Sequence, residues 1–278
     1  MLFRSCAHCR DPRTNLCLAI REQQGRGLLP DGTTRLSRDG EPVRHFMGTS
    51  TFAEYTVMPE IALAKITPDA PLDGACLFAC GLSTGLGAAM NTAAVQPGSA
   101  CVVFGAGMVG LGAVAGSRLR GAERIVCVDL SPERLELARG QGATDLLRGG
   151  PDAVAEILEL TGGLGADYTF EATGNVAVMR QAVEAARMGW GLATVCGVAG
   201  KGETLDVVPR LLITGRRVAG SSFGGVKGRD QVPELVERWL AGEIDVAPFI
   251  SHRISLDDVN RGFELMERQD GIRSVIEF

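Results

Sequence analysis

Apolar and polar residues follow different patterns in different parts of the chain. From Ser83 to about Phe223, short apolar runs alternate with stretches in which apolar residues recur every three or four positions. The first pattern predicts buried strands and the second predicts helices. Strands are predicted near 100–104, 125–128, 145–147, 168–171, 192–196 and 218–220, and helices near 108–120, 132–139, 152–160 and 176–187. Strands joined by crossover helices predict an α/β fold, a doubly wound parallel sheet of the Rossmann type.

Several predicted helices carry capping residues. Ser131 precedes Pro132, an N-cap followed by proline at the first helical position. Asp152 is predicted to cap the next helix. Ser255 and Asp258 have capping-box spacing, with aspartate in place of the usual glutamate or glutamine.

The two ends of the chain differ from this central region. Residues 1 to about 82 contain no long helical pattern, are rich in turn signals, and carry extended runs at 52–57 and 61–66. This predicts an irregular β-rich domain. The last residues add helices near 230–241 and after 255, and a strand at 273–278 that we expect to return to the first domain. The predicted domains are therefore 1–82, 83–225 and 226–278.

Composition narrows the class of protein. The 278 residues are 45% hydrophobic and 22% charged, which is typical of a globular enzyme. A net charge of −5 argues against a nucleic-acid partner or an anionic membrane surface. No apolar stretch reaches the roughly 18 residues of a membrane span, and Met1–Arg4 is too short for a signal peptide. Most of the eight cysteines lie in apolar strands without an export signal, which predicts a reducing, cytoplasmic location.

A glycine motif, Gly105-Ala-Gly107-Met-Val-Gly110, follows the apolar run 100–104. Gly105 allows a tight turn, Gly107 lets the backbone approach a pyrophosphate, and Gly110 lets the helix pack close to the sheet. The helix N-terminus then faces the phosphates. Because the chain has 37 glycines, the bare motif also fits an ordinary turn before a helix.

Asp129 makes a dinucleotide site the stronger interpretation. It ends the next apolar run, 19 residues after Gly110. An acid at this place accepts hydrogen bonds from the adenosine ribose hydroxyls and repels a 2′-phosphate. The sequence therefore predicts NAD rather than NADP as the cofactor.

A second cluster, Cys6-x2-Cys9-x7-Cys17, has spacing suited to zinc thiolates. Three cysteines do not complete a four-ligand structural site, so a set of free thiols is the alternative. His8 lies between two of them and is the weaker candidate, because adjacent ligands strain the geometry.

The remaining cysteines have apolar surroundings. Cys80, taken alone, is typical of a buried core residue, and so are Cys76, Cys101, Cys127 and Cys196.

Taken together, these motifs resemble the zinc-dependent medium-chain alcohol dehydrogenases of class III, the glutathione-dependent formaldehyde dehydrogenases. The resemblance runs from about Ser5 to the end of the chain. It is carried by residues 12–17, 27–33, 45–57, 80–85, 105–110, 196–198, 220–225 and 272–275. It implies that residues 1–82 are the remainder of a GroES-like catalytic domain.

The resemblance also implies cofactors and residue roles. NAD and zinc are the expected cofactors, and S-(hydroxymethyl)glutathione or another primary or long-chain alcohol is the expected substrate. In such enzymes zinc polarises the substrate oxygen while hydride passes to the nicotinamide. The implied roles are: Cys80 as a ligand of catalytic zinc; Cys6, Cys9 and Cys17 as ligands of structural zinc; Thr84 and Val109 against the nicotinamide; Val198 at the carboxamide; Asp129 at the ribose; Arg134 near the adenosine end; Arg273 at the pyrophosphate; and Arg21 at a substrate carboxylate.

Two departures from the family pattern bear on activity. Phe3 stands where the family has its first structural-zinc cysteine, and the residues that would supply the other catalytic-zinc ligands are not matched. We therefore expect an N-terminally truncated chain with little activity of its own. The alternatives are an impaired NAD-binding relic and a zinc-free, quinone-reductase-like oxidoreductase, although the latter has no use for the cysteine loop.

The family resemblance also implies a homodimer. Residues 216–223 should form the edge strand of the sheet, and two copies are expected to pair there across a two-fold axis.

Overall fold

The computed structural model describes residues 6–11, 13–29 and 31–278. The chain divides into two compact units. Unit 1 is Met1–Asp69, Lys227–Pro233 and Ile250–Phe278, and unit 2 is Ala70–Val226 and Glu234–Phe249. The division therefore lies at 69/70, whereas the sequence pattern placed the first domain boundary at 82/83.

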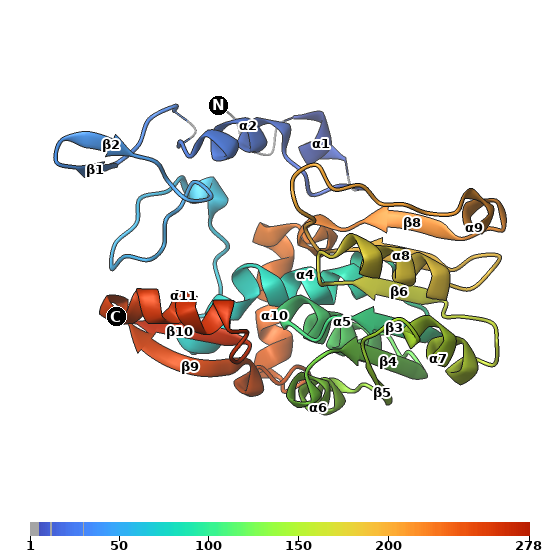
Figure 1. The fold of residues 1–278 in the computed structure, drawn as a ribbon. Helices are drawn as coiled ribbons and strands as arrows, with labels where there is room; N and C mark the ends of the chain where they lie inside the picture. Colours follow the sequence, from blue (N-terminus) through green and yellow to red (C-terminus); the bar gives the residue numbers. More distant parts are fainter. Residues whose placement is uncertain (1–5, 12, 30) are drawn as a thin grey trace. The chain divides into compact units, whose positions relative to one another are not determined.

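Unit 2 is built on a parallel sheet with the strand order β5-β4-β3-β6-β7-β8 (Figure 1). Its strands are β3 (Ala100–Phe104), β4 (Arg124–Asp129), β5 (Asp145–Arg148), β6 (Tyr168–Glu171), β7 (Leu192–Val195) and β8 (Arg217–Gly220). In the central register Val102 lies opposite Val126 on one side and Thr169 on the other. Each strand agrees with its predicted range to within one residue at either end, and the Rossmann-type sheet is confirmed.

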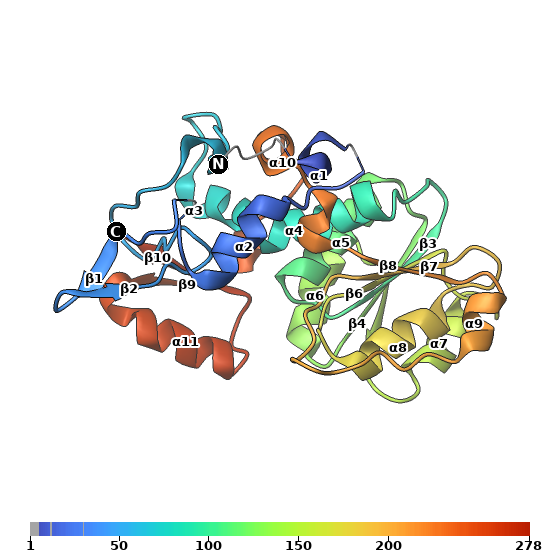
Figure 2. The same ribbon diagram turned by 90° about the horizontal axis from the view of Figure 1, so that it is seen from above.

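Helices cover both faces of this sheet (Figure 2). They are α5 (Met108–Leu119), α6 (Pro132–Gln141), α7 (Ala153–Leu160) and α8 (Val176–Ala185), with α3 (Leu72–Ala75), α4 (Gly81–Gly87) and α9 (Pro209–Ile213) beside them. Helix α10 (Gly228–Leu240) begins in unit 1 and ends in unit 2. Burial on two faces explains why the central strands are unbroken apolar runs: Cys101, Val102 and Val103 are all fully buried.

Side chains that alternate along the strands form two separate core layers. One layer joins Val102, Phe104 and Val126 to Ile157 of α7 and Ala182 of α8. On the opposite face α5 packs against β3. This packing fixes the start of α5 at the carboxyl end of β3.

The helix ends follow local capping chemistry, with two corrections. Ser131 caps α6, accepting a hydrogen bond from the Arg134 N–H at 3.2 Å, as predicted. Asp152 makes no side-chain cap, so that prediction is wrong. Its backbone is already helical (φ −87°, ψ −7°), whereas an N-cap needs an extended backbone. Ser255 donates to the Asp258 carboxylate instead of accepting from the backbone, so no capping box forms.

Unit 1 has shorter elements. They are α1 (Ala7–Arg10), α2 (Leu18–Arg26), the hairpin strands β1 (Leu36–Arg38) and β2 (Glu41–Val43), the parallel strands β9 (Ile250–Ser255) and β10 (Arg273–Glu277), and α11 (Val259–Glu267). The C-terminal strand belongs to unit 1, as expected. The strands predicted at 52–57 and 61–66 are absent from the described chain, where only a short 3-10 turn, Glu60–Ala62, forms. An extended run becomes a strand only when a neighbour pairs with it, and no described segment does so here.

In the described part of the chain, no single helix is both long and apolar enough to cross a membrane. One bent pair, Leu72–Ala79 with Gly81–Thr92, passes that test by length and composition alone.

Candidate functional site

The glycine motif forms a tight turn between β3 and α5. Gly105 has φ +93°, a backbone conformation that favours glycine. A Cβ at Gly110 would lie 1.6 Å from the Gly105 carbonyl oxygen, so only glycine fits there. A Cβ at Gly107 would meet no atom within 4 Å, and its backbone therefore borders open space. The turn offers N–H groups and the N-terminus of α5 to an anion.

Asp129 lies directly against this turn. Its Oδ2 accepts a hydrogen bond from the Ala106 N–H at 2.6 Å, and its Oδ1 accepts one from the Ser131 N–H at 2.9 Å. The carboxylate at the end of β4 is thus tied to the glycine turn at the end of β3. This is the arrangement needed to hold a ribose next to a pyrophosphate.

Helix α4 packs unusually close to α5. A Cβ at Gly85 would lie 2.0 Å from the Val109 carbonyl oxygen, and one at Gly112 would lie 2.8 Å from the Leu82 carbonyl oxygen. Glycines on both helices therefore allow the backbones to touch. Thr84 is 8% exposed and directly precedes Gly85, the residue that approaches the Val109 carbonyl.

Cys80 lies at the N-terminal end of α4 and is exposed, so its interpretation as a core residue is wrong. Its carbonyl oxygen accepts hydrogen bonds from the Thr84 N–H at 2.9 Å and the Thr84 hydroxyl at 2.8 Å. The backbone turn between two short helices presents the thiol to solvent instead of the core.

The other cysteines outside unit 1 differ in burial. Cys101 and Cys127 are buried as predicted, and burial raises the pKa of each thiol to about 12. Cys196 is partly buried, and burial raises its pKa to about 12 as well. Cys76 is exposed, which corrects its assignment to the core. It follows the one-turn helix α3, and its thiol donates to the Asp73 carbonyl at 3.0 Å.

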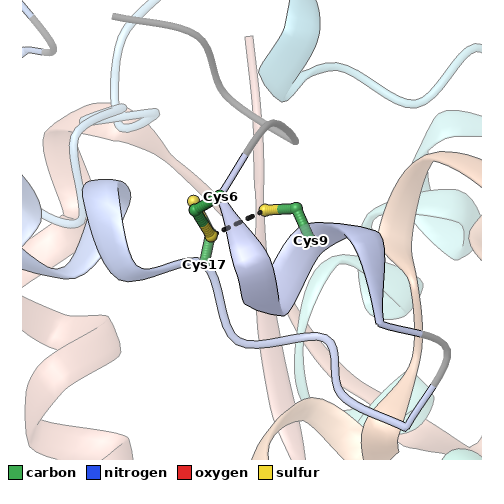
Figure 3. Close-up of side chains that lie close together, drawn as sticks. All are labelled: Cys6, Cys9 and Cys17. Atoms are coloured by element: carbon green, nitrogen blue, oxygen red, sulfur yellow. Dashed lines mark hydrogen bonds between the residues drawn. The ribbon is translucent and has the colours of Figure 1, made fainter.

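The thiols of Cys6, Cys9 and Cys17 converge in unit 1 (Figure 3). The three Sγ atoms lie within 4.8 Å of one another, and those of Cys6 and Cys9 are 3.4 Å apart. A zinc ion with Zn–S bonds of about 2.3 Å would reach all three. The three residues therefore fit as part of a zinc site, and they are brought together by the short helix α1 and the start of α2.

Electrostatics distinguishes these thiols. A hydrogen bond from the Leu18 backbone, followed by one from the Cys9 backbone, lowers the pKa of Cys6 to about 6. Burial and the neighbouring thiols raise the pKa of Cys9 to about 11. The lowered pKa of Cys6 favours its thiolate, the form in which cysteine binds a metal ion.

Comparison with known proteins agrees with this site. The family described as "Zinc-binding dehydrogenase" matches residues 108–241. The S-(hydroxymethyl)glutathione dehydrogenase of Escherichia coli O1:K1 is 49% identical over 275 residues, covering 98% of this chain and 74% of that protein. The chain belongs to the zinc-dependent medium-chain alcohol dehydrogenase family. NAD and zinc are the cofactors of this family.

Solved structures give the same result. An alcohol dehydrogenase zinc-binding domain protein from Burkholderia ambifaria superposes with a TM-score of 0.92 at 32% identity, over 99% of this chain and 74% of that one. The benzyl alcohol dehydrogenase of Acinetobacter calcoaceticus gives 0.91 at 29% identity, over 99% and 75%. The chain thus spans about three quarters of these alcohol dehydrogenases.

A catalytic zinc does not fit the described residues. Such an ion needs three protein ligands and an open position, but within the described chain the only group of three metal-ligating side chains is Cys6, Cys9 and Cys17. Cys80 is therefore a single candidate ligand among the described residues. Phe3, the position of the first structural-zinc cysteine in the family, lies outside the described residues.

The other predicted cofactor and substrate residues are distributed over both units. Arg134 is partly buried in the first turn of α6, and the Val198 side chain is 92% exposed after β7. Arg273 begins β10 in unit 1, where its guanidinium donates to the Ile272 carbonyl at 3.1 Å. Arg21 is part of α2, but its side chain lies outside the described residues. The roles of all four remain predictions.

Sequence reasoning missed Glu171, a fully buried acid at the end of β6. The available signal was an acid at the end of the predicted strand Tyr168–Glu171, one residue before Thr173-Gly174. A run of four residues does not by itself show that the acid at its end is buried.

Proposed function

We propose that this chain carries the NAD site of a dehydrogenase that oxidises S-(hydroxymethyl)glutathione or a related primary or long-chain alcohol. The observation that carries the proposal is the hydrogen bond from the Ala106 N–H to Asp129, beside a turn whose close packing requires Gly110. Bound NAD would accept hydride from the alcohol carbon. The name of the Escherichia coli relative supports the glutathione adduct as the substrate class.

Different residues of this chain would bind different parts of NAD. Gly105, Gly107 and Gly110 would cradle the pyrophosphate, and Asp129 would bind the adenosine ribose hydroxyls. Because a carboxylate repels a 2′-phosphate, NAD is the expected cofactor and NADP is not. The further assignments are Arg134 near the adenosine, Thr84 and Val109 against the nicotinamide, Val198 at its carboxamide, and Arg273 at the pyrophosphate.

In the same proposal, zinc has one well-supported site. Cys6, Cys9 and Cys17 would hold a structural zinc, which would stabilise the loop that carries them. Cys80 would serve a catalytic zinc only together with ligands that the described residues do not supply. Arg21 would receive a carboxylate of the substrate.

We also propose a cytoplasmic homodimer. The cysteines are all free, which suits a reducing compartment. Strand β8 is the last strand of its sheet, and it exposes Val218. The preceding helix α9 exposes Ile213, which is 84% accessible. Pairing with a second copy would cover these apolar side chains and the free edge together.

Titration calorimetry with NAD and NADP tests the cofactor assignment. The wild-type chain should bind NAD more than about tenfold more tightly than NADP, because the Asp129 carboxylate accepts hydrogen bonds from the ribose hydroxyls of NAD and repels the 2′-phosphate of NADP. Asp129→Gly should lower the affinity for NAD and reduce the difference in affinity between NAD and NADP. A wild-type chain that binds NADP as tightly as NAD would contradict the role of Asp129.

A further inference from the structure

Glu171 occupies an unusual position for a carboxylate. It closes β6, is fully buried, and forms no ion pair with a described residue. Burying a charge without a cation is costly unless hydrogen bonds compensate for it. Ligands of open parallel sheets bind at the carboxyl ends of the strands. A buried carboxylate at such a strand end is therefore a candidate for a functional role.

The hydrogen bonds of Glu171 are concentrated on one short turn. Oε1 accepts from the Thr173 N–H at 2.6 Å, from the Thr173 hydroxyl, and from the Gly174 N–H at 2.9 Å. The second oxygen, Oε2, is buried and has no hydrogen-bond partner among the described residues. The carboxylate thus closes the turn 172–174 over the end of its own strand.

Glu171 and its turn also contact the loop after β7. The Glu171 carbonyl accepts from the Cys196 N–H at 2.8 Å and the Gly197 N–H at 3.1 Å. A Cβ at Gly197 would lie 2.6 Å from Oε2. A Cβ at Gly174, where φ is +81°, would lie 2.6 Å from the Val198 carbonyl oxygen.

The turn also touches the phosphate-binding turn of β3. A Cβ at Gly105 would lie 2.7 Å from the Thr173 Cγ2 atom. Three strand ends therefore meet around one carboxylate: the Gly105 turn of β3, the Thr173–Gly174 turn of β6, and the Gly197–Val198 loop of β7.

Strand order shows which half of the cofactor would lie over this junction. The order β4-β3-β6-β7 places Asp129 on one side of the Gly105 turn and Glu171 on the other. If Asp129 holds the adenosine ribose and the glycine turn holds the pyrophosphate, the rest of NAD must extend over β6 and β7. That part is the nicotinamide and its ribose.

We propose that Glu171 is a positioning residue for the nicotinamide half of NAD. It acts through the turn 172–174 and the Val198 loop, whose backbone it holds in one shape, and it does not itself touch the cofactor. This inference rests on the proposed NAD function and adds a residue to which no role has been assigned.

The test compares NAD with ADP-ribose, which lacks the nicotinamide, by calorimetry on the full chain. Glu171→Ala should lower the affinity for NAD by about tenfold, the effect of losing hydrogen bonds to a charged group. Its affinity for ADP-ribose should stay within about twofold of the wild-type value. Glu171→Gln keeps an oxygen for the three donors and should restore most of the NAD affinity. Glu171→Asp is one methylene too short to reach the turn, so it should behave like Glu171→Ala and serves if the alanine variant does not fold.

Thr169→Val is the matched control. Thr169 is buried on the same strand, where its hydroxyl donates to the Ala182 carbonyl at 2.8 Å, away from the strand end. This variant should unfold at a lower temperature and bind both ligands as the wild type does.

The positioning role would be overturned if Glu171→Ala and Glu171→Asp lowered the affinities for NAD and ADP-ribose equally. It would also be overturned if these variants changed neither affinity. A wild-type chain in which the nicotinamide adds nothing to the affinity for ADP-ribose would overturn it as well. A wild-type chain that binds neither ligand would instead refute the proposed NAD function.

Discussion

The two units of this chain show how differently sequence patterns translate into structure. In unit 2, apolar runs become strands of one sheet, and the side chains of Val102, Val126 and Phe170 are fully buried. In unit 1, similar runs remain irregular and leave large apolar side chains exposed: Tyr55 is 88% accessible and Val57 is 62% accessible. The difference does not lie in local β propensity, which both regions have.

The deciding factor is whether a run has a partner within the described chain. Each strand of the unit 2 sheet pairs with a neighbouring strand in a defined register. Helices cover both faces of this sheet (Figure 2). The run at 52–57 has no paired neighbour among the described residues. A site on unit 2 is therefore built on paired strands, whereas the thiol cluster of unit 1 lies between the short helix α1 and the start of α2.

The first and strongest expectation concerns catalysis. A polypeptide of residues 1–278 should give negligible NADH with S-(hydroxymethyl)glutathione or octanol, roughly three orders of magnitude below a complete enzyme, because its described residues offer only Cys80 to a catalytic zinc. A chimera that adds the quarter of the Escherichia coli relative not spanned by this chain is the positive control. Robust turnover by residues 1–278 alone would show that further ligands exist.

A second prediction concerns the close packing of Gly110 against the Gly105 carbonyl in unit 2. Gly110→Ala should lower the free energy of unfolding by about 3 kcal/mol and abolish NAD binding, because its Cβ would overlap the Gly105 carbonyl. Gly107→Ala is the matched control, since its Cβ meets nothing within 4 Å. Gly107→Ala should leave the melting temperature unchanged and lower only the affinity for NAD. Thermal denaturation and calorimetry measure both variants, and a Gly110→Ala protein of wild-type stability would refute the packing argument.

A smaller effect concerns the free edge of unit 2. The N–H groups of Arg217 and Ser221 donate to β7, so by alternation the Val218 N–H faces the open edge. Val218→Pro should therefore spare the fold and shift a dimer towards monomer in light scattering. Ala219→Pro, whose N–H faces β7, should destabilise the protein instead. A wild-type chain that is monomeric at micromolar concentration would contradict the dimer.

Sequence reasoning performed well where the chain's own periodicity decides the structure. It located all six strands of the sheet, the Gly105–Gly110 turn and the cap at Ser131. It could not locate features that depend on tertiary contacts. Asp152 has capping chemistry but a helical backbone, and Cys80 lies in apolar sequence but at an exposed turn.

The same limit applies to the candidate site. Spacing alone brought Cys6, Cys9 and Cys17 together, because they lie close in the sequence. Glu171 was missed because its importance comes from the turns of β3 and β7, which are distant in sequence and meet only in the folded sheet.

We propose that this chain binds NAD at the Gly105–Gly110 turn and zinc at Cys6, Cys9 and Cys17, and that its described residues form no catalytic zinc site. Native mass spectrometry of the 278-residue chain, supplied with NAD and zinc, counts both ligands in one measurement. We expect one NAD and one zinc per chain, with the zinc lost in Cys17→Ser. A chain that binds no NAD, or that holds two zinc ions, would contradict the account.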